Sequence, residues 1–514
     1  MPSGKRQAQR ARCPCVSVHR LDLLLLLFSL VLLVAVAAVR LSSRSGLPSL
    51  LLYLGIGVLL GHDGIGSITF DNAELTQVLG YAALVVILAE GGLGTRWTDI
   101  RPAVPAAAVL ATVGTAISVG VVAIGAHLFT GADWRVSLLL GAVVSSTDAA
   151  AVFSVLRRVP LPSRLSGLLE AESGFNDAPV VILVVAFATS GPVDSWYVLI
   201  GTVVGELAVG IVVGLVVGRL GALTLRHVAL PSSGLYPIAV VALTILAYAG
   251  GALLDGSGFL ATYICALLLG NARLPHGPAT RGFAEGLAWI AQISMFVMLG
   301  LLVNPRTMGD AIVPALVVGL VLVLAARPAS VLLTLTPFRI ALREQALLSW
   351  AGLRGAVPIV LATIPVVHNV PGAGQLFNTV FLLVVVFTLI QGPTLPWVAR
   401  ALRISDSAHA DDLEVESAPL DRLQGHLLSV SVGPESRLGG VEIHELRLPK
   451  GAAVTLIVRD GESFVPGPTT LLRHGDDLLV VATDQVRDRA ERRLRAVDRG
   501  GKLAGWLSGS RTEY

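Results

Sequence analysis

Six consecutive residues, 172–177, combine two carboxylates, a hydroxyl and an amide. They read Glu-Ser-Gly-Phe-Asn-Asp and stand directly before an apolar run, residues 178–189. Helical spacing places Ser173, Asn176 and Asp177 on one face, at i, i+3 and i+4. Because an ionisable side chain at mid-membrane costs roughly 2.5–3.5 kcal/mol on insertion scales, a buried acidic face indicates a path for cations. The alternative interpretation is a polar helix start capped by Ser173.

Two further acidic side chains lie in upstream hydrophobic segments. Asp148 follows three hydroxyl-bearing residues, 145–147, which can satisfy backbone groups if the helix is interrupted there. The alternative for Asp148 is a Ser/Thr-rich packing face near a helix end. Glu90 either lines the same path or lies at the cytoplasmic interface, and the sequence favours neither reading.

An arginine in a downstream hydrophobic segment supplies the opposite charge. The residues that we expect to interrupt this helix are Gly352, Gly355 and Pro358. Arg354 keeps its charge in the membrane and therefore needs an acidic partner. Glu172 and Asp148 are the candidates, and we prefer Glu172.

The composition is that of a protein that crosses a membrane many times. Of 514 residues, 54% are apolar and 14% are charged, whereas soluble domains carry roughly 25% charged residues. The net charge of +3 gives no argument for a nucleic-acid partner, and three cysteines build no disulfide framework. A span needs about 20 apolar residues. This rule gives thirteen segments: 21–39, 47–61, 76–94, 103–126, 136–156, 167–189, 196–218, 235–254, 257–272, 284–303, 311–336, 345–366 and 376–399.

The arginines orient these segments. If the first segment runs into the cytoplasm, cytoplasmic links carry fifteen arginines and outer links carry two. This is the bias of the positive-inside rule, and it predicts a multi-pass protein of the cell (inner) membrane with a cytoplasmic C-terminus. The basic tail, residues 1–20, conflicts with this topology. We interpret residues 1–15 as a misassigned translation start rather than as part of a signal peptide.

The two interrupted helices belong to the fifth and twelfth segments. An offset of seven segments gives them opposite orientations, which suits inverted repeats formed by segments 1–6 and 8–13, with segment 7 as a joint. Interrupted helices in matching positions of two halves point to a transport site. The predicted fold is therefore an all-α polytopic membrane domain, residues 21–403, in which two broken helices cross.

The C-terminal part has the composition of a soluble module. Residues 404–420 read as an acidic linker. In the module, residues 421–497, strands are expected at 426–432, 452–459 and 477–483, and helices at 437–446 and 485–497. This small α+β domain needs a dimer partner to complete its core, and residues 498–514 are expected to be a flexible tail.

Three motifs carry a resemblance to a known family. Ser-Ser-Thr-Asp at 145–148, the 172–177 motif and Gly-Leu-Arg-Gly-Ala-Val-Pro at 352–358 agree in order and spacing with monovalent cation/proton antiporters of the CPA1 family, NhaP branch. The C-terminal module, residues 421–497, resembles the regulatory domain called TrkA-C or RCK-C. Together they resemble the potassium/proton members of the branch, and they imply a homodimer in the lipid bilayer and a nucleotide ligand at the C-terminal domain.

The resemblance implies a cation and proton site. Asp177 would bind cation and proton in turn, with help from Asn176, and the monovalent cation would be held at Asp177, Ser173 and Thr147. The Asn-Asp pair of the family implies electroneutral exchange of one cation for one proton. Burial disfavours the carboxylate anion and a bound K⁺ or Na⁺ favours it, so the two ions would compete for one site.

The resemblance also implies structural roles. Glu172 and Arg354 would form an ion pair between segments 6 and 12, and Asp148 would lie where the broken helices cross. A sodium/proton antiporter of the same fold is the first alternative. A regulated cation channel is the second, although no T-V-G-Y-G-like filter occurs. An enzyme is disfavoured because motifs such as H-E-x-x-H are missing, and no P-loop (a nucleotide-cofactor motif) occurs.

Overall fold

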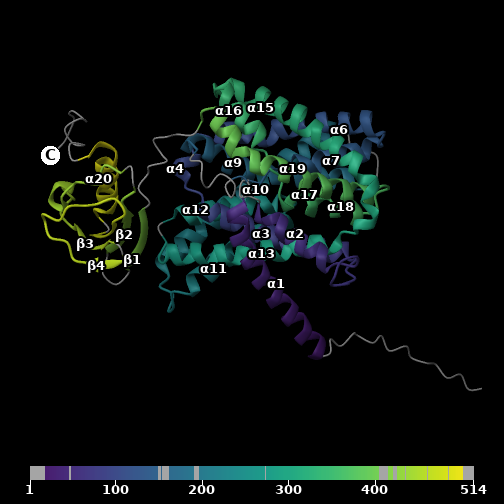
Figure 1. Ribbon diagram of the computed structural model, residues 1–514. Helices are drawn as coiled ribbons and strands as arrows, with labels where there is room; N and C mark the ends of the chain where they lie inside the picture. The colour runs from purple at the N-terminus through teal and green to yellow at the C-terminus, as the bar shows by residue number, and fades with distance from the viewer. Residues whose placement is uncertain are drawn as a thin grey trace, which may run out of the picture.

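The computed structural model has two parts, a helical bundle and a small domain built on a sheet (Figure 1). It describes residues 18–45, 48–148, 152, 161–189, 196–272, 274–404, 415–420, 425–433, 436–459, 461–483 and 485–501. The tail that we attribute to a misassigned start, residues 1–15, and most of the C-terminal tail lie outside these ranges.

The described residues contain thirteen helical segments in the bundle, the number predicted. Among the described residues, eight helices are long and apolar enough to cross a membrane, and five shorter apolar helices accompany them. The first six segments comprise α1 (Val18–Ser45), α2 (Ser49–Leu60), α3 (Ala73–Gly94), α5 (Val104–Val109) continued by η1 (Leu110–Gly114) and α6 (Thr115–Thr130), α7 (Trp134–Ser145) and α9 (Ser163–Ala188), with a short interfacial helix α4 (Trp97–Ile100). The seventh segment is α10 (Trp196–His227).

The second half repeats this order. It comprises α11 (Leu235–Leu253), α12 (Gly258–Asn271), α13 (Gly277–Leu302), α14 (Ile312–Val321) continued by η4 (Leu322–Ala326) and α15 (Arg327–Leu335), then α16 (Leu342–Trp350), α17 (Ala356–Leu361), α18 (Thr363–Val367) and α19 (Ala373–Ala401). Short 3₁₀ turns are η2 (Pro305–Thr307), η3 (Gly309–Ala311) and η5 (Thr336–Phe338).

The bundle consists of two groups of helices. One group contains α2, α3 and α10–α13, which pack mainly against one another, and the other contains α5–α9 and α14–α19. Figure 1 shows the second group above the first. The groups meet where α9 contacts α10 and α12, and where α17 and α18 contact α3.

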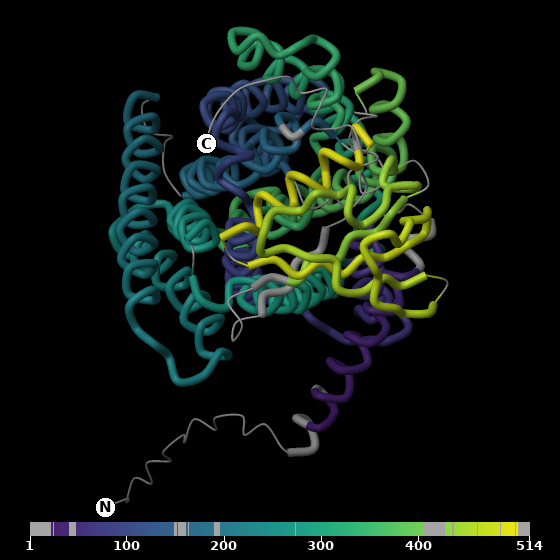
Figure 2. Tube along the Cα trace, turned by 90° about the vertical axis from the view of Figure 1, so that its left-hand side faces the viewer, coloured from purple at the N-terminus to yellow at the C-terminus, as the bar shows by residue number. Residues whose placement is uncertain are grey.

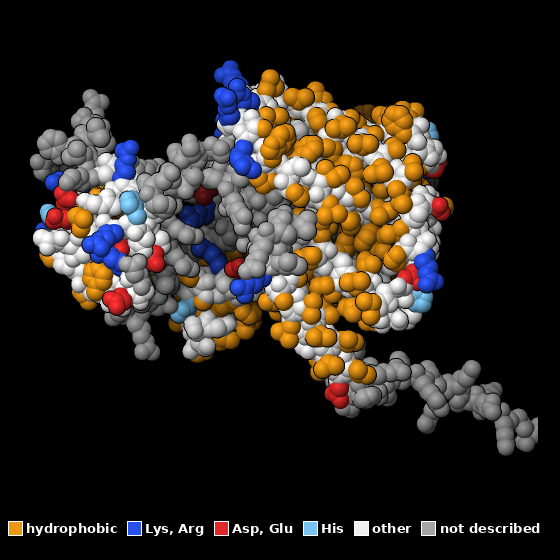
Figure 3. Space-filling view, viewed as in Figure 1, with side chains coloured by type: hydrophobic (Ala, Val, Ile, Leu, Met, Phe, Trp, Pro, Cys, Tyr) orange, Lys and Arg blue, Asp and Glu red, His pale blue; other side chains and the backbone are white. Residues whose placement is uncertain are grey.

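The outside of the bundle is apolar, as a bilayer requires. Figure 3 shows hydrophobic side chains over most of the visible bundle surface. Exposed apolar side chains include residues of α1 and α10, where Leu33 and Val204 are 69% and 61% exposed. Such a continuous apolar surface is unstable in water and indicates a lipid environment.

π-Helical turns mark matching helices of the two halves. η1 interrupts the fourth segment and η4 the eleventh, and each is a single turn with a wider backbone spacing. η1 packs against α15, and η4 packs against α6. Isolated π-turns often lie at functional sites, and this pair supports the inverted-repeat architecture expected from the sequence.

The small domain contains one antiparallel sheet of order β1-β2-β5-β3-β4. Its elements are β1 (Val415–Leu420), β2 (Gly425–Ser431), η6 (Ile443–Leu446), β3 (Ala452–Arg459), β4 (Glu462–Phe464), β5 (Asp477–Thr483) and α20 (Arg487–Gly500). Its core joins the sheet to α20 through Val430, Val480 and Leu494, all fully buried. Figure 1 places it beside α4, at the end of the bundle that we call the basic end, and Figure 2 shows it from that side. Arg96 directly precedes α4 there, and Arg219 lines the same groove as Trp97 of α4.

Three expectations for this part were wrong. Residues 415–420, expected in the linker, form β1, because they complete a sheet edge by pairing with β2. Residues 437–446 contain turns and η6 instead of a helix. α20 reaches Gly500 and thus enters the expected flexible tail.

Candidate functional site at two interrupted helices

Two helix ends lie close together and are joined by a backbone hydrogen bond. α7 ends at Ser145 and α16 at Trp350, and α17 begins at Ala356. In the interruptions, the N–H of Asp148 donates to the carbonyl of Leu353 at 3.0 Å. This backbone bond confirms that the broken parts of the fifth and twelfth segments meet.

Glycine makes this approach possible. A Cβ atom on Gly355 would lie 1.8 Å from Oδ2 of Asp148, and one on Gly352 would lie 2.7 Å from Nη1 of Arg354. No real Cβ tolerates such a distance to its neighbours. Pro358 lies in the first turn of α17, where its missing N–H would have no helical partner, so it starts the new helix and does not break one.

At the crossing, each charged side chain lies at a helix end whose partial charge has the opposite sign. Arg354 is 3% exposed, and its Nε donates to the carbonyl of Val144 at 2.8 Å, in the last turn of α7. Its Nη1 donates to the carbonyl of Gly352. Carbonyls at a helix C-terminus lack intrahelical donors and carry partial negative charge. The carboxylate of Asp148, in turn, lies against Gly355, which caps the positive N-terminus of α17.

Asp177 is buried beside the interruption in α7. It is 6% exposed, and Ser146 Oγ donates to its Oδ1 at 2.6 Å. Asn176 Nδ2 donates to Thr147 Oγ1 at 2.5 Å, and Ser173 Oγ donates to the carbonyl of Thr147 at 3.0 Å. The predicted face of α9, formed by Ser173, Asn176 and Asp177, therefore contacts Ser146 and Thr147.

A cavity of about 310 Å³ leads to this cluster. Thr95, which follows α3 and precedes Arg96, lines it at the basic end, and Glu170 lines it two turns before Asp177 on α9. Asp148, Ser173 and Thr147 also line it. Glu90 lies in the same wall, four residues before the end of α3, which fits the reading that it lines the path.

Two residues of this cluster, Ser146 and Glu170, were not among the predicted site residues. Ser146 lies within the Ser-Ser-Thr-Asp motif, next to the predicted Thr147. Glu170 lies seven residues before Asp177, which is two helical turns on one face. That spacing was available in the sequence, but Glu170 precedes the motif and resembles an interfacial acid.

The expected ion pair between Glu172 and Arg354 was assigned to the wrong arginine. Glu172, 2% exposed, is bound by both ends of the Arg327 guanidinium, with Nη1–Oε1 at 2.5 Å and Nη2–Oε2 at 2.8 Å. Arg327 is the first residue after the π-turn η4 and is buried in the bundle. Arg354 is satisfied by backbone carbonyls instead.

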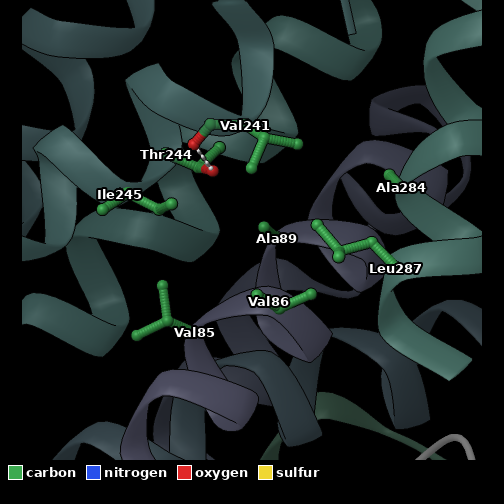
Figure 4. Close-up of a pocket in the computed structure, with 8 residues that line it drawn as sticks. All are labelled: Val85, Val86, Ala89, Val241, Thr244, Ile245, Ala284 and Leu287. Carbon is green, nitrogen blue, oxygen red and sulfur yellow. Dashed lines mark hydrogen bonds between the residues drawn. The ribbon is translucent and has the colours of Figure 1, made fainter. Parts of the chain in front are cut away.

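A second small gap has a different character. Figure 4 shows it between α3, α11 and α13, lined by apolar side chains such as Val85 and Ile245. Its one hydroxyl, on Thr244, donates to the carbonyl of Val241 at 2.8 Å. Because no carboxylate lines it, this gap offers no ion a site.

The polar groups around Asp177 are mainly carboxylate, hydroxyl and carbonyl oxygens. Within the described ranges, no three His, Cys, Asp or Glu side chains cluster as metal ligands. A carboxylate, hydroxyls and a carbonyl at an interrupted helix are hard oxygen ligands, which alkali cations and protons can share. Fold and site together define a membrane transporter built from inverted repeats with broken helices.

Comparison with known proteins specifies the family. The profile described as "Sodium/hydrogen exchanger, transmembrane" matches residues 29–401, and the TrkA-C domain matches residues 427–495. The chain belongs to the sodium/hydrogen exchanger family, and it is a secondary transporter that exchanges cations for protons.

Relatives and solved structures agree. The chain is 37% identical to the K(+)/H(+) antiporter NhaP of Alkalimonas amylolytica over 474 residues, 90% of this chain and 82% of that protein. It is 34% identical to the K(+)/H(+) antiporter NhaP2 of Shewanella oneidensis over 478 residues, 90% and 81% of the two chains. The sodium proton antiporter MjNhaP1 from Methanocaldococcus jannaschii has the same fold, with a TM-score of 0.65 and 21% identity over 74% of this chain and 99% of that chain.

Proposed function

We propose that the protein exchanges cytoplasmic K⁺ for external H⁺, one for one, with Asp177 binding the two ions in turn. The observation that carries this proposal is the buried carboxylate of Asp177, which lines a cavity together with Thr147, Asp148 and Ser173. The choice of K⁺ is supported by the names of the two relatives at 37% and 34% identity. Na⁺ is the rival, because the Na(+)/H(+) antiporter ApNhaP of Aphanothece halophytica is 27% identical over 80% of this chain and 82% of that protein.

The ligands of the cation would come from both sides of the interruption. Asp177 supplies a carboxylate, Ser173 a hydroxyl and Thr147 a backbone carbonyl. Asn176 adds an amide oxygen, which is buried and accepts no hydrogen bond from the described residues. A bound cation neutralises Asp177, and so does a proton, hence either loaded form avoids a buried naked charge.

Competition for one carboxylate makes the exchange obligatory. If the site changes its exposure only when it is loaded, each K⁺ moved one way requires one H⁺ moved the other way. The neighbour of Asp177 in the motif is the neutral Asn176, so one positive charge is carried in each direction. This keeps the exchange electroneutral.

The proposed topology places the protein in the cell (inner) membrane, with the basic end on the cytoplasmic side. The arginine bias of the links supports this orientation. The cavity at Asp177 would then be open to the cytoplasm, and the TrkA-C domain would lie there. A homodimer and a nucleotide ligand at that domain remain predictions of the resemblance.

Flux in proteoliposomes tests the proposal. Vesicles loaded with a pH-sensitive dye should show proton movement when K⁺ is added, more than with Na⁺, across a series of pH values. Asp177→Asn should abolish this movement while the protein stays folded and inserted. Glu206→Gln is the control, because Glu206 is a half-buried carboxylate on another spanning helix and lies outside the cavity.

Three outcomes would refute parts of the proposal. Normal exchange by the Asp177→Asn protein would remove the assignment of the site. A larger response to Na⁺ than to K⁺ would reverse the selectivity. K⁺ flux that continues without counter-movement of protons would instead favour a channel.

A further inference from the structure

A groove of about 860 Å³ runs along the seam between the two helix groups. One wall consists of α10 and α12, and the other of α4, α5 and Phe175 from α9. We call it the α10 groove. It is separate from the cavity at Asp177, with which it shares no lining residue.

One part of the α10 groove is apolar. Leu207, Ile211 and Leu215 follow one another at four-residue intervals along α10. Ile264 on α12 and Ala108 on α5 face the same space. Because this stretch of α10 borders the exposed apolar surface of the bundle, acyl chains can enter the groove from the bilayer.

The other part of the α10 groove is basic. Arg219 and Arg226 line it, two turns apart near the C-terminus of α10. Both are exposed, and no Asp or Glu is among the described lining residues. Trp97 on the opposite wall and Asn271 at the end of α12 complete this part. The side chain of Asn271 accepts a hydrogen bond from the N–H of Trp97 at 2.8 Å.

The two arginines lie at the depth of lipid headgroups. At the other end of α10, Trp196 and Tyr197 are 74% and 63% exposed, as aromatic residues at a membrane interface commonly are. About 20 helical residues cross the hydrocarbon, which brings the chain from Tyr197 to just before Arg219. Arg226 lies about 10 Å further along the axis.

A ligand for this groove must be apolar at one end and anionic at the other. We propose that the α10 groove binds an anionic phospholipid of the leaflet at the basic end, with its phosphate at Arg219 and Arg226 and an acyl chain along Leu207, Ile211 and Leu215. Basic pockets between transmembrane helices recognise anionic headgroups in this way. The lipid would contact both helix groups, so its binding would couple the bilayer composition to any movement of one group against the other.

Binding can be measured on the full-length protein without any assumption about transport. Delipidated protein in detergent is titrated with dioleoyl phosphatidylglycerol or dioleoyl phosphatidylcholine, and bound lipid is counted by native mass spectrometry. The anionic lipid should bind more tightly. Arg219→Gln with Arg226→Gln should weaken phosphatidylglycerol binding by about 25-fold, which corresponds to about 1 kcal/mol for each basic side chain.

Matched variants separate the headgroup from the groove. Arg343→Gln with Arg400→Gln removes two exposed arginines outside the groove and should leave the affinity unchanged. Ala108→Trp fills the apolar part and should abolish tight binding, whereas Val212→Trp, at a 58% exposed position of α10 outside the groove, should not.

The proposal fails on any of three results. The first is an affinity for phosphatidylcholine equal to that for phosphatidylglycerol. The second is an unchanged affinity for phosphatidylglycerol in the Arg219/Arg226 double variant. The third is tight lipid binding that persists in the Ala108→Trp protein. Competition by inorganic phosphate as strong as by the lipid would show a free-anion site and would also overturn it. Failure of the proposed exchange activity would leave the binding result unaffected.

Discussion

Two arginines are buried in the bundle, and their charges are compensated in different ways. Arg327 is bound by the carboxylate of Glu172, with a side chain 6% exposed. Arg354 donates to carbonyls that two interrupted helices leave without partners. Gly352 lies between them, because a Cβ there would be 2.7 Å from Arg354 Nη1 and 3.0 Å from Arg327 Nε.

Removal of Arg327 tests which arginine pairs with Glu172. Arg327→Ala leaves a buried carboxylate unpaired, which costs about 3–5 kcal/mol. We expect a sharp loss of folded protein in gel filtration and a lower thermal midpoint. Adding Glu172→Gln to Arg327→Ala should restore part of the loss, because the unpaired charge disappears. A normal midpoint for Arg327→Ala, or no rescue by Glu172→Gln, would contradict the assignment.

At the scale of the elements, the crossing depends on how closely two interrupted segments approach. The bond between Asp148 N–H and the Leu353 carbonyl requires backbones in contact. Each interruption leaves polar backbone groups in the membrane interior, which is tolerated only where they are buried in protein or line a cavity. Arg354, Asp148 and the cavity meet this requirement together.

Gly355 is the position at which this element can be tested. Gly355→Ala introduces a Cβ 1.8 Å from Asp148 Oδ2, so the carboxylate or the backbone must move. We expect exchange activity to fall at least tenfold and the thermal midpoint to drop. Gly374→Ala is the control, because its Cβ would meet nothing within 4 Å in α19. Equal behaviour of the two alanine variants would mean that the crossing is looser than described.

At the scale of the whole molecule, the bundle and the TrkA-C domain are stabilised by different forces. The bundle is apolar outside and polar at its centre. The small domain has an apolar core and a buried ion pair at its edge, where Arg459 binds both oxygens of Asp476, at 2.7 and 2.8 Å. The N–H of Arg473 also donates to Asp476, at 2.8 Å.

These contacts make the stability of the small domain depend on pH. Burial by itself would raise the pKa of Asp476, but hydrogen bonds from Arg459 and Arg473 outweigh it and lower the pKa below its usual value. A depressed pKa contributes stability above the unfolded pKa of about 4, and the contribution is lost as pH falls through the folded pKa. Asp476→Asn should therefore destabilise the domain by about 2 kcal/mol at pH 7.

Hydrogen exchange of β3 and β5 peptides in the full-length protein measures this effect. The difference between wild type and Asp476→Asn should shrink below about pH 4. Asp477→Asn is the matched control, because Asp477 is the exposed neighbour and its loss should change stability little. A deficit that stays constant as the pH falls would exclude the ion pair as its cause.

The sequence alone determined the features that depend on composition and spacing. Hydropathy gave the thirteen segments because the bilayer sets the length of apolar helices. Glycines predicted the interruption of the twelfth segment because glycine weakens a helix locally, and the hydroxyl-bearing residues before Asp148 predicted the one in the fifth segment. The helical period predicted that Ser173, Asn176 and Asp177 share one face of α9. Three motifs in the same order and spacing indicated the family.

Only the tertiary structure decided which side chains meet across segments far apart in the chain. The pairing of Glu172 with Arg327 depends on the rotation of α15 after a π-turn, and no pattern in the sequence reports that rotation. Ser146 and Thr147 are adjacent and chemically alike, so only the direction of the broken backbone could assign Asp177 to one of them. The strand β1 likewise exists because a sheet edge was available to pair with, a contact that local propensity does not encode.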